Sequence, residues 1–251
     1  MAAVVCACAG AKAPPVKPNP QVADEAMFGF LRAKDAAHAA HLIAEERKFL
    51  EIGALRSPDQ IVVADVLLKR GFTGVSVRAL LEPRELLLAG MEAKIPLASG
   101  SKISTVGISQ QAIILMPATT LDERVDRAIG RERFKFMQRA NRFGPDTHGS
   151  ELDAHIAELR EQAVSPEFAA YRLEVIGTRS QLFTLLRDVS VRAVFVNRDS
   201  GRARSLLAQR RELEKHARSI GPSVRMGRVE GVKPISAGPR TSQDRSATAT
   251  R

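Results

Sequence analysis

A short histidine-containing stretch offers the first combination of side chains that could do chemistry. His38, His41 and Glu45 are spaced three and four residues apart, within a segment whose apolar periodicity predicts a helix over residues 35–52. On a helix these side chains lie on one flank, and two imidazoles with a carboxylate can bind zinc. The usual helical zinc pair is spaced four residues apart, which this histidine pair is not. A solvated helix flank is therefore the alternative interpretation.

A second polar group, between residues 146 and 155, has the residue types of a catalytic site. It combines two histidines with three acids: Asp146, His148, Glu151, Asp153 and His155. The first two lie in a predicted loop, and the others begin a predicted helix, where acidic side chains favour the helix dipole. A polar loop followed by a helix start explains the same residues without catalysis.

Motifs that would mark a nucleophile or a nucleotide site are absent from the sequence. There is no GxSxG and no GxxxxGK[ST], and both cysteines, Cys6 and Cys8, lie in the first ten residues. The segment 98–105, ASGSKIST, lacks the glycine spacing of a phosphate loop. The sequence therefore predicts no catalytic residue, no cofactor and no assigned metal ligand, and it favours a protein that is not an enzyme.

Positive charge is concentrated at the C-terminal end of the chain. The net charge of the 251 residues is +10, and residues 197–251, with thirteen basic and five acidic side chains, hold +8 of it. Eight basic residues are predicted to contact an acidic partner: Arg202, Arg204, Arg210, Arg211, Lys215, Arg218, Arg225 and Arg228. They could meet an acidic protein surface or neutralise the phosphates of a nucleic acid.

Two features of the segment 198–228 help to distinguish an acidic protein from a nucleic acid as its partner. The segment has no aromatic side chain on which a base could stack. Glu212 and Glu214 lie among its arginines, which favours pairing with a partner helix over pure phosphate binding. A solubilising basic tail without a partner is the remaining interpretation.

Three functional hypotheses follow from these observations. The leading one is a non-enzymatic interaction module whose basic C-terminal extension binds an acidic partner. The second is a sequence-nonspecific nucleic-acid-binding protein that uses residues 198–228. The third is a metal-dependent enzyme that uses His38 and His41.

Periodicity and turn signals predict the elements that would position these residues. Helices are expected over residues 35–52, 60–70, 119–143, 150–163 and 180–187, and strands over residues 73–81, 102–109, 111–116, 171–176 and 191–196. Residues 82–90 fit either a helix or a strand. Thr120 and Glu123 have the spacing of a capping box at the start of the helix 119–143.

The predicted fold is an α+β domain over residues 24–197. A mixed β-sheet would carry helices mainly on one face, and the strand, helix and strand of residues 171–197 would form a βαβ unit in its C-terminal half. A basic helix, 198–220, and a disordered basic tail, 221–251, would follow.

The N-terminal 23 residues are expected to be a disordered, proline-rich segment, because residues 12–22 hold four prolines. The first residues contain a short apolar run that ends in small residues but lacks the basic start of a signal peptide. The protein would be cytoplasmic as encoded, or exported if this run is a truncated signal. No apolar run reaches the length of a transmembrane segment.

Overall fold

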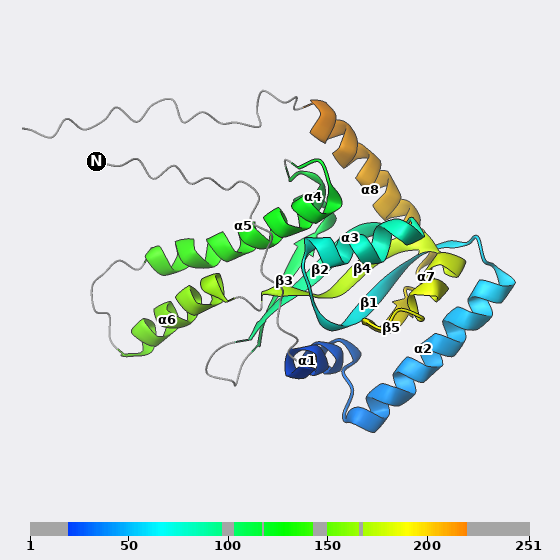
Figure 1. Cartoon of the computed structure of the whole chain (residues 1–251), viewed down its shortest axis with the longest axis horizontal. Helices are drawn as coiled ribbons and strands as arrows, with labels where there is room; N and C mark the ends of the chain where they lie inside the picture. Colours follow the sequence, from blue (N-terminus) through cyan, green and yellow to red (C-terminus); the bar gives the residue numbers. More distant parts are fainter. Residues whose placement is uncertain (1–19, 97–102, 117, 143–149, 166–167, 220–251) are drawn as a thin grey trace, which may run out of the picture. The chain divides into compact units, whose positions relative to one another are not determined.

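The computed structural model describes residues 20–96, 103–116, 118–142, 150–165 and 168–219 (Figure 1). Five strands form one sheet: β1 (Ile61–Phe72), β2 (Leu87–Pro96), β3 (Ile103–Ser109), β4 (Ala169–Thr178) and β5 (Val191–Val196). The α-helices are α1 (Pro20–Leu31), α2 (Ala36–Arg56), α3 (Gly74–Leu81), α4 (Gln110–Ile114), α5 (Leu121–Asn141), α6 (Ser150–Val164), α7 (Arg179–Leu185) and α8 (Ser200–Ser219). A short 3-10 helix, η1 (Glu82–Arg84), precedes β2. The α+β class predicted from the sequence is confirmed.

The strand order across the sheet is β3-β2-β4-β1-β5, and each neighbouring pair is antiparallel. The prediction of a mixed sheet is therefore wrong. It followed from placing the two strands of residues 171–197 side by side, which would make them a parallel pair. In the structure β1 lies between β4 and β5 and pairs with both.

The topology is that of two interleaved split βαβ units. In the first unit, β1-α3-β2, the strand β4 separates the two strands, and in the second, β4-α7-β5, β1 separates them. This is a ferredoxin-like βαββαβ order, with the edge strand β3 and the helices α4, α5 and α6 inserted between β2 and β4. The predicted C-terminal βαβ unit is present, but its two strands are not neighbours.

The larger hydrophobic core lies on the face of the sheet that α3, α5 and α7 cover. Its strand residues alternate along β1 and β4, as the two-residue period of a strand requires, and include Val66, Leu173 and Val175. Leu81 of α3 and Leu182 of α7 are fully buried against them. The predicted inward direction of Leu173 and Val175 is thus confirmed.

The opposite face of the sheet also carries helices, which differs from the prediction that helices lie mainly on one face. At one end, α1 packs Val22, Ala23 and Ala26 on Ala169 and Tyr171 of β4. At the other end, α8 packs on β1, β2 and β4 through a separate apolar cluster: Ala203, Leu206 and Leu207 against Val63, Ala89 and Ile176. A third apolar cluster packs Met27 of α1 and Ala39 of α2 on Leu67 of β1 and Ala193 of β5. The part of the face left between these clusters is polar.

Two neighbouring segments have their predicted types exchanged. Residues 60–70, predicted as a helix, lie in β1, and residues 73–81, predicted as a strand, form α3. In α3 the buried residues are Val77, Leu80 and Leu81, at helical spacing, whereas Val75 is 58% exposed. The apparent alternation of valines in this segment therefore does not reflect a strand.

The segment 111–116, predicted as a strand, is also helical, because it falls largely in α4. The Ser109 hydroxyl caps this helix by accepting a hydrogen bond from the Ala112 amide, at 3.3 Å. The predicted capping box of α5 is absent, since the Thr120 side chain makes no cap hydrogen bond. A capping box does occur at α7, between Thr178 and Gln181.

Helix α8 belongs to the same compact unit as the sheet, and α1 begins at Pro20, inside the stretch predicted to be an extended linker. Most of the predicted N-terminal segment and the whole of the predicted tail, 221–251, lie outside the described residues. Within the described ranges, the helices all fall short of the length and apolarity that crossing a membrane would need.

Gly74, at the start of α3, provides a test of how closely α3 packs on α5. A Cβ atom at this position would overlap the Asp122 carbonyl group, and the Gly74 amide donates a 2.7 Å hydrogen bond to Asp126. Gly74→Ala is expected to lower the free energy of unfolding in urea by about 1–3 kcal/mol, because the backbones must separate.

Gly130→Ala is the matched control, since Gly130 is an exposed residue of α5 with open space around its Cβ position. It should raise the free energy of unfolding by about 0.5–1 kcal/mol, through the better helix propensity of alanine. Equal stability of the two variants would contradict the close contact at Gly74.

Candidate functional site

The polar strip between α1 and α8 is built by the alternation of side chains along the three inner strands. The residues next to the buried Val66 and Leu173 point to the opposite face, which places Asp65 of β1 and Arg172 and Glu174 of β4 on it. The register sets Asp65 directly opposite Glu174, and Glu92 of β2 opposite Arg172. Side chains from three strands are therefore collected on one surface.

Arg172 holds two of these carboxylates. Its Nη1 lies 3.4 Å from Oδ1 of Asp65, and its Nη2 lies 2.7 Å from Oε2 of Glu92. One face of the guanidinium is covered by the ring of Phe30 in α1, with 5.1 Å between Cζ and the ring centroid. Lys94, which is buried, adds a 3.4 Å contact to Glu92. These contacts fix the orientation of Arg172 along the strip.

The third carboxylate, Glu174, is paired with an arginine from α8. Arg202 donates from Nε to Oε1 of Glu174 at 3.0 Å, and its Nη2 contacts the same oxygen. The apolar contacts of Ala203 with the sheet hold the first turns of α8 in place, so Arg202 reaches Glu174 from above the sheet. A second inward arginine, Arg210, donates to the Leu88 carbonyl oxygen at 3.3 Å and pairs with Glu214 at 2.7 Å.

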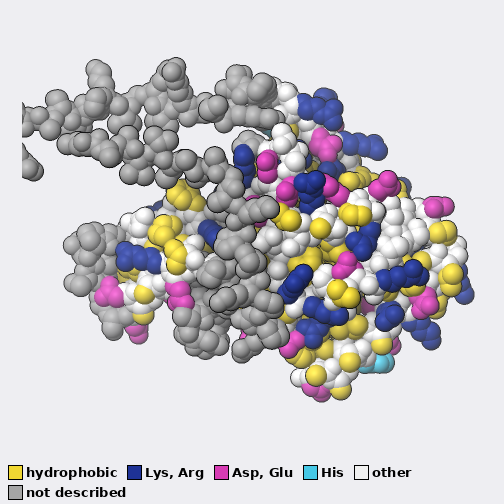
Figure 2. Space-filling model, in the orientation of Figure 1, with side chains coloured by type: hydrophobic (Ala, Val, Ile, Leu, Met, Phe, Trp, Pro, Cys, Tyr) yellow, Lys and Arg dark blue, Asp and Glu magenta, His cyan; other side chains and the backbone are white. Residues whose placement is uncertain are grey.

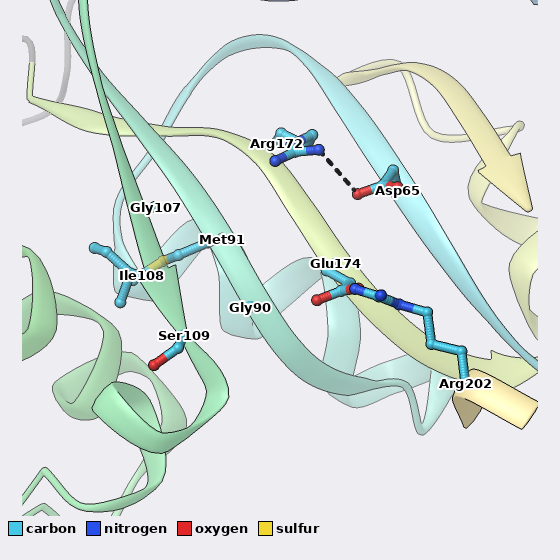
Figure 3. A pocket seen from close by; sticks show the side chains of 9 residues that line it. All are labelled: Asp65, Gly90, Met91, Gly107, Ile108, Ser109, Arg172, Glu174 and Arg202. Carbon is cyan, nitrogen blue, oxygen red and sulfur yellow. Dashed lines mark hydrogen bonds and ion pairs between the residues drawn. The ribbon is translucent and has the colours of Figure 1, made fainter. Parts of the chain in front are cut away.

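An open cleft of about 310 Å³ lies beside these ion pairs (Figure 3). The charged residues occupy its β4, β1 and α8 side, and the backbones of β2 and β3 form the other side. The cleft is lined by Asp65, Gly90, Met91, Gly107, Ile108, Ser109, Arg172, Glu174 and Arg202. Two of these positions are glycines on adjacent strands, so no side chain there fills the hollow.

The carboxyl group of Asp65 has a pKa above its ordinary value. Burial is the largest cause, because it disfavours the charged form, and the negative charge of Glu174 acts in the same direction. The positive charges of Arg172 and Arg202 oppose this rise. The pKa of Asp65 is therefore set by its burial and, after that, by the balance of charge around it.

The structure places the predicted metal ligands at the surface of α2. His41 Nε2 lies 3.4 Å from Oε1 of Glu45, and both side chains are more than 60% exposed. Nδ1 of His38 instead accepts a hydrogen bond from the Lys34 amide, at 3.3 Å. Among the described residues, no three His, Cys, Asp or Glu side chains gather closely enough to hold a metal ion.

The second predicted group, residues 146–155, lies only partly within the described residues. Asp146 and His148 lie outside the described residues. His155 in α6 contacts Glu158 of the same helix, with 3.9 Å between Nδ1 and Oε2. Glu151 and Asp153 lie in the first turn of α6, as predicted for helix-start acids.

The predicted basic residues of the C-terminal region divide into two sets within the described part of the chain. Arg202 and Arg210 form the ion pairs with acidic side chains described above. The other four, here called the basic stripe, are exposed and make no ion pair with any described residue: Arg204, Arg211, Lys215 and Arg218. Arg225 and Arg228 lie outside the described residues.

Comparison with protein-family models, with curated proteins and with solved structures gives no match to this chain.

Sequence reasoning did not find the cleft residues Asp65 and Glu174. Asp65 lay in a segment that was predicted to be a helix, and Glu174 was identified only as an outward residue of a strand. A signal was nevertheless present, because Asp65 interrupts the otherwise apolar run VVADVLL, and Glu174 lies with Arg172 between the apolar residues of YRLEVI. An acidic residue in a buried strand needs a partner, which is a reason to look for one.

The two neighbours of Asp65 should shift its pKa in opposite directions. Glu174→Gln removes a negative charge and should lower the pKa of Asp65, whereas Arg172→Gln removes the strongest opposing positive charge and should raise it. An NMR titration of the side-chain carboxyl carbons measures both changes. His41→Gln, at the distant surface of α2, is the control and should leave the Asp65 titration unchanged. Shifts of the same sign in both cleft variants would contradict the assigned charge balance.

Proposed function

We propose that the protein is a non-enzymatic interaction module that binds an acidic surface of a partner protein through the basic stripe of α8. The observation that carries this proposal is the spacing of the four stripe residues. They are seven, four and three residues apart, so at about 100° per residue they lie within about 60° of one another on the helix. Figure 2 shows Lys and Arg side chains at the upper right, where α8 lies.

The other contacts of α8 support a fixed position for this stripe. Leu206 and Leu207 pack on the sheet, Arg202 is held by Glu174 of β4, and Arg210 donates to the Leu88 carbonyl oxygen of β2. The side chains of the stripe therefore project from a helix that is already anchored. A preorganised charged surface binds with a smaller loss of conformational entropy than a flexible one.

Two features favour an acidic protein over a nucleic acid as the partner. Glu212 and Glu214 lie about 80° to either side of the stripe, so they would approach the phosphates of a wide polyanion but leave a narrow acidic ridge undisturbed. Helix α8 also carries no Phe, Tyr or Trp side chain for base stacking. An acidic helix that presents Glu or Asp at helical spacing matches the stripe in width and in sign.

The proposal is tested by measuring the binding of a fluorescein-labelled poly-glutamate peptide to the full chain over a salt series. Neutralising the stripe with Arg204→Gln, Arg211→Gln, Lys215→Gln and Arg218→Gln should weaken binding by about ten- to a hundredfold. It should also flatten the salt dependence, because fewer ion pairs form.

A matched control neutralises four exposed basic residues outside α8: Arg47, Lys48, Arg56 and Lys69. This variant has the same net charge as the stripe variant but should bind the peptide nearly as well as the natural chain. Equal losses in the two variants would mean that net charge alone attracts the peptide and would contradict a defined site. Binding of mixed-sequence double-stranded DNA more tightly than the peptide would favour the nucleic-acid alternative instead.

A further inference from the structure

The cleft of Figure 3 is separate from the basic stripe, and Arg202 is the residue of α8 that lines it. It lies on the inner side of the helix, where Arg202 meets Glu174, whereas the stripe residues are solvent-exposed. Its volume of about 310 Å³ falls at the lower end of the range for small-molecule sites. The cleft is therefore large enough to hold a small ligand.

Two carboxylate oxygens and one guanidinium nitrogen in the cleft have no hydrogen-bond partner among the described residues. Both contacts of Arg202 go to Oε1 of Glu174, so Oε2 of Glu174 accepts no hydrogen bond within the described part of the chain. Asp65 likewise uses only Oδ1, which contacts Arg172. On the donor side, Nη1 of Arg202 forms no hydrogen bond with any described residue.

The positions of the two carboxylates suit a ligand ammonium group. Asp65 and Glu174 are direct cross-strand neighbours on the same face, a geometry in which Cβ atoms are about 5 Å apart. Burial and mutual repulsion make it costly to hold both as anions, and a positive group between them offsets that cost. The ammonium donors would reach the two free carboxylate oxygens.

The arginines suit a ligand carboxylate. A guanidinium group offers planar donors that match a carboxylate, and Arg202 has an unused Nη1 at the edge of the cleft. The lining side chains comprise two acids and two arginines, so their formal charges cancel. A ligand with a single charge would pair with the carboxylates or with the arginines, but not with both. A zwitterion can pair with both.

The glycine side of the cleft provides the space. A Cβ atom on Gly107 would meet no other atom within 4 Å, so the volume above β3 is open. On Gly90 a Cβ atom would approach Oε2 of Glu174 to 3.2 Å, which places this free oxygen over the adjacent strand β2. Glycines at both positions keep the path between the carboxylate oxygen and the β3 backbone clear.

We propose that this cleft binds a small zwitterion of amino-acid size, with its ammonium group on Asp65 and Glu174 and its carboxylate on Arg202. The ligand would bridge the sheet and α8 and so strengthen their contact. This site is independent of the basic stripe, and neutralising the stripe leaves it intact.

The first experiment is calorimetric titration of the full chain with each of the twenty common L-amino acids. At least one should bind saturably, and its decarboxylated amine and its deaminated carboxylic acid should each bind at least about tenfold more weakly, because each lacks one charged contact. Failure of all twenty to bind at about 10 mM overturns the proposal. Equal binding of the amine or of the acid also overturns it, because the ligand would then be recognised by one charge only.

Two variants locate the binding. Gly107→Leu places a side chain in the open volume around the Cβ position and should abolish binding, whereas Gly130→Leu makes the same change at an open position on α5 and should not affect it. Glu174→Gln should weaken binding by at least about tenfold, since it removes a charge from the ammonium contact. Circular dichroism checks that each variant is folded. Binding that survives Gly107→Leu in the folded protein overturns the assignment to this cleft.

Discussion

The pairing of β1 with β4 at the centre of the sheet is the constraint on which the other features depend. Each of these strands has an apolar face that packs into the main core, so their register is fixed by burial. That register brings Asp65 and Glu174 face to face on the other side of the sheet. A shift of either strand by one residue would turn its own carboxylate into the core. The polar strip, its two arginines and the cleft are consequences of this single alignment.

The two carboxylates require positive charge, and they receive it from different parts of the chain. Arg172 is local, since it lies on β4 itself, whereas Arg202 comes from α8. Because Arg202 is needed at the sheet, the C-terminal helix is held against the body by polar as well as apolar contacts. The surplus positive charge of the described C-terminal region is therefore presented from a docked helix. The two sides of α8 have separate environments: one is part of the cleft, and the other faces solvent.

Several elements followed from the sequence because their local signals agree. The helices α2, α5 and α6 have apolar residues at helical spacing, and the strands β4 and β5 are bounded by turn residues. The errors fall where tertiary contacts change the pattern. Strand β1 is buried on both faces, because α1 and α8 cover the side opposite the core, so it shows a continuous apolar run in place of alternation. A run of that kind does not distinguish a strand from a buried helix.

The sequence by itself determined the α+β class, the position of most helices, the absence of a nucleophile motif and the concentration of arginine near the C-terminus. These properties depend on local order and composition, which the chain carries residue by residue. The tertiary structure alone decided that β1 lies between β4 and β5, that Asp65 meets Glu174, and that Arg202 faces inward while Arg204 faces solvent. Such contacts join residues far apart in the chain, as the 107 positions between Asp65 and Arg172 illustrate. Burial and charge pairing in the folded state select these contacts. No local sequence pattern predicts them.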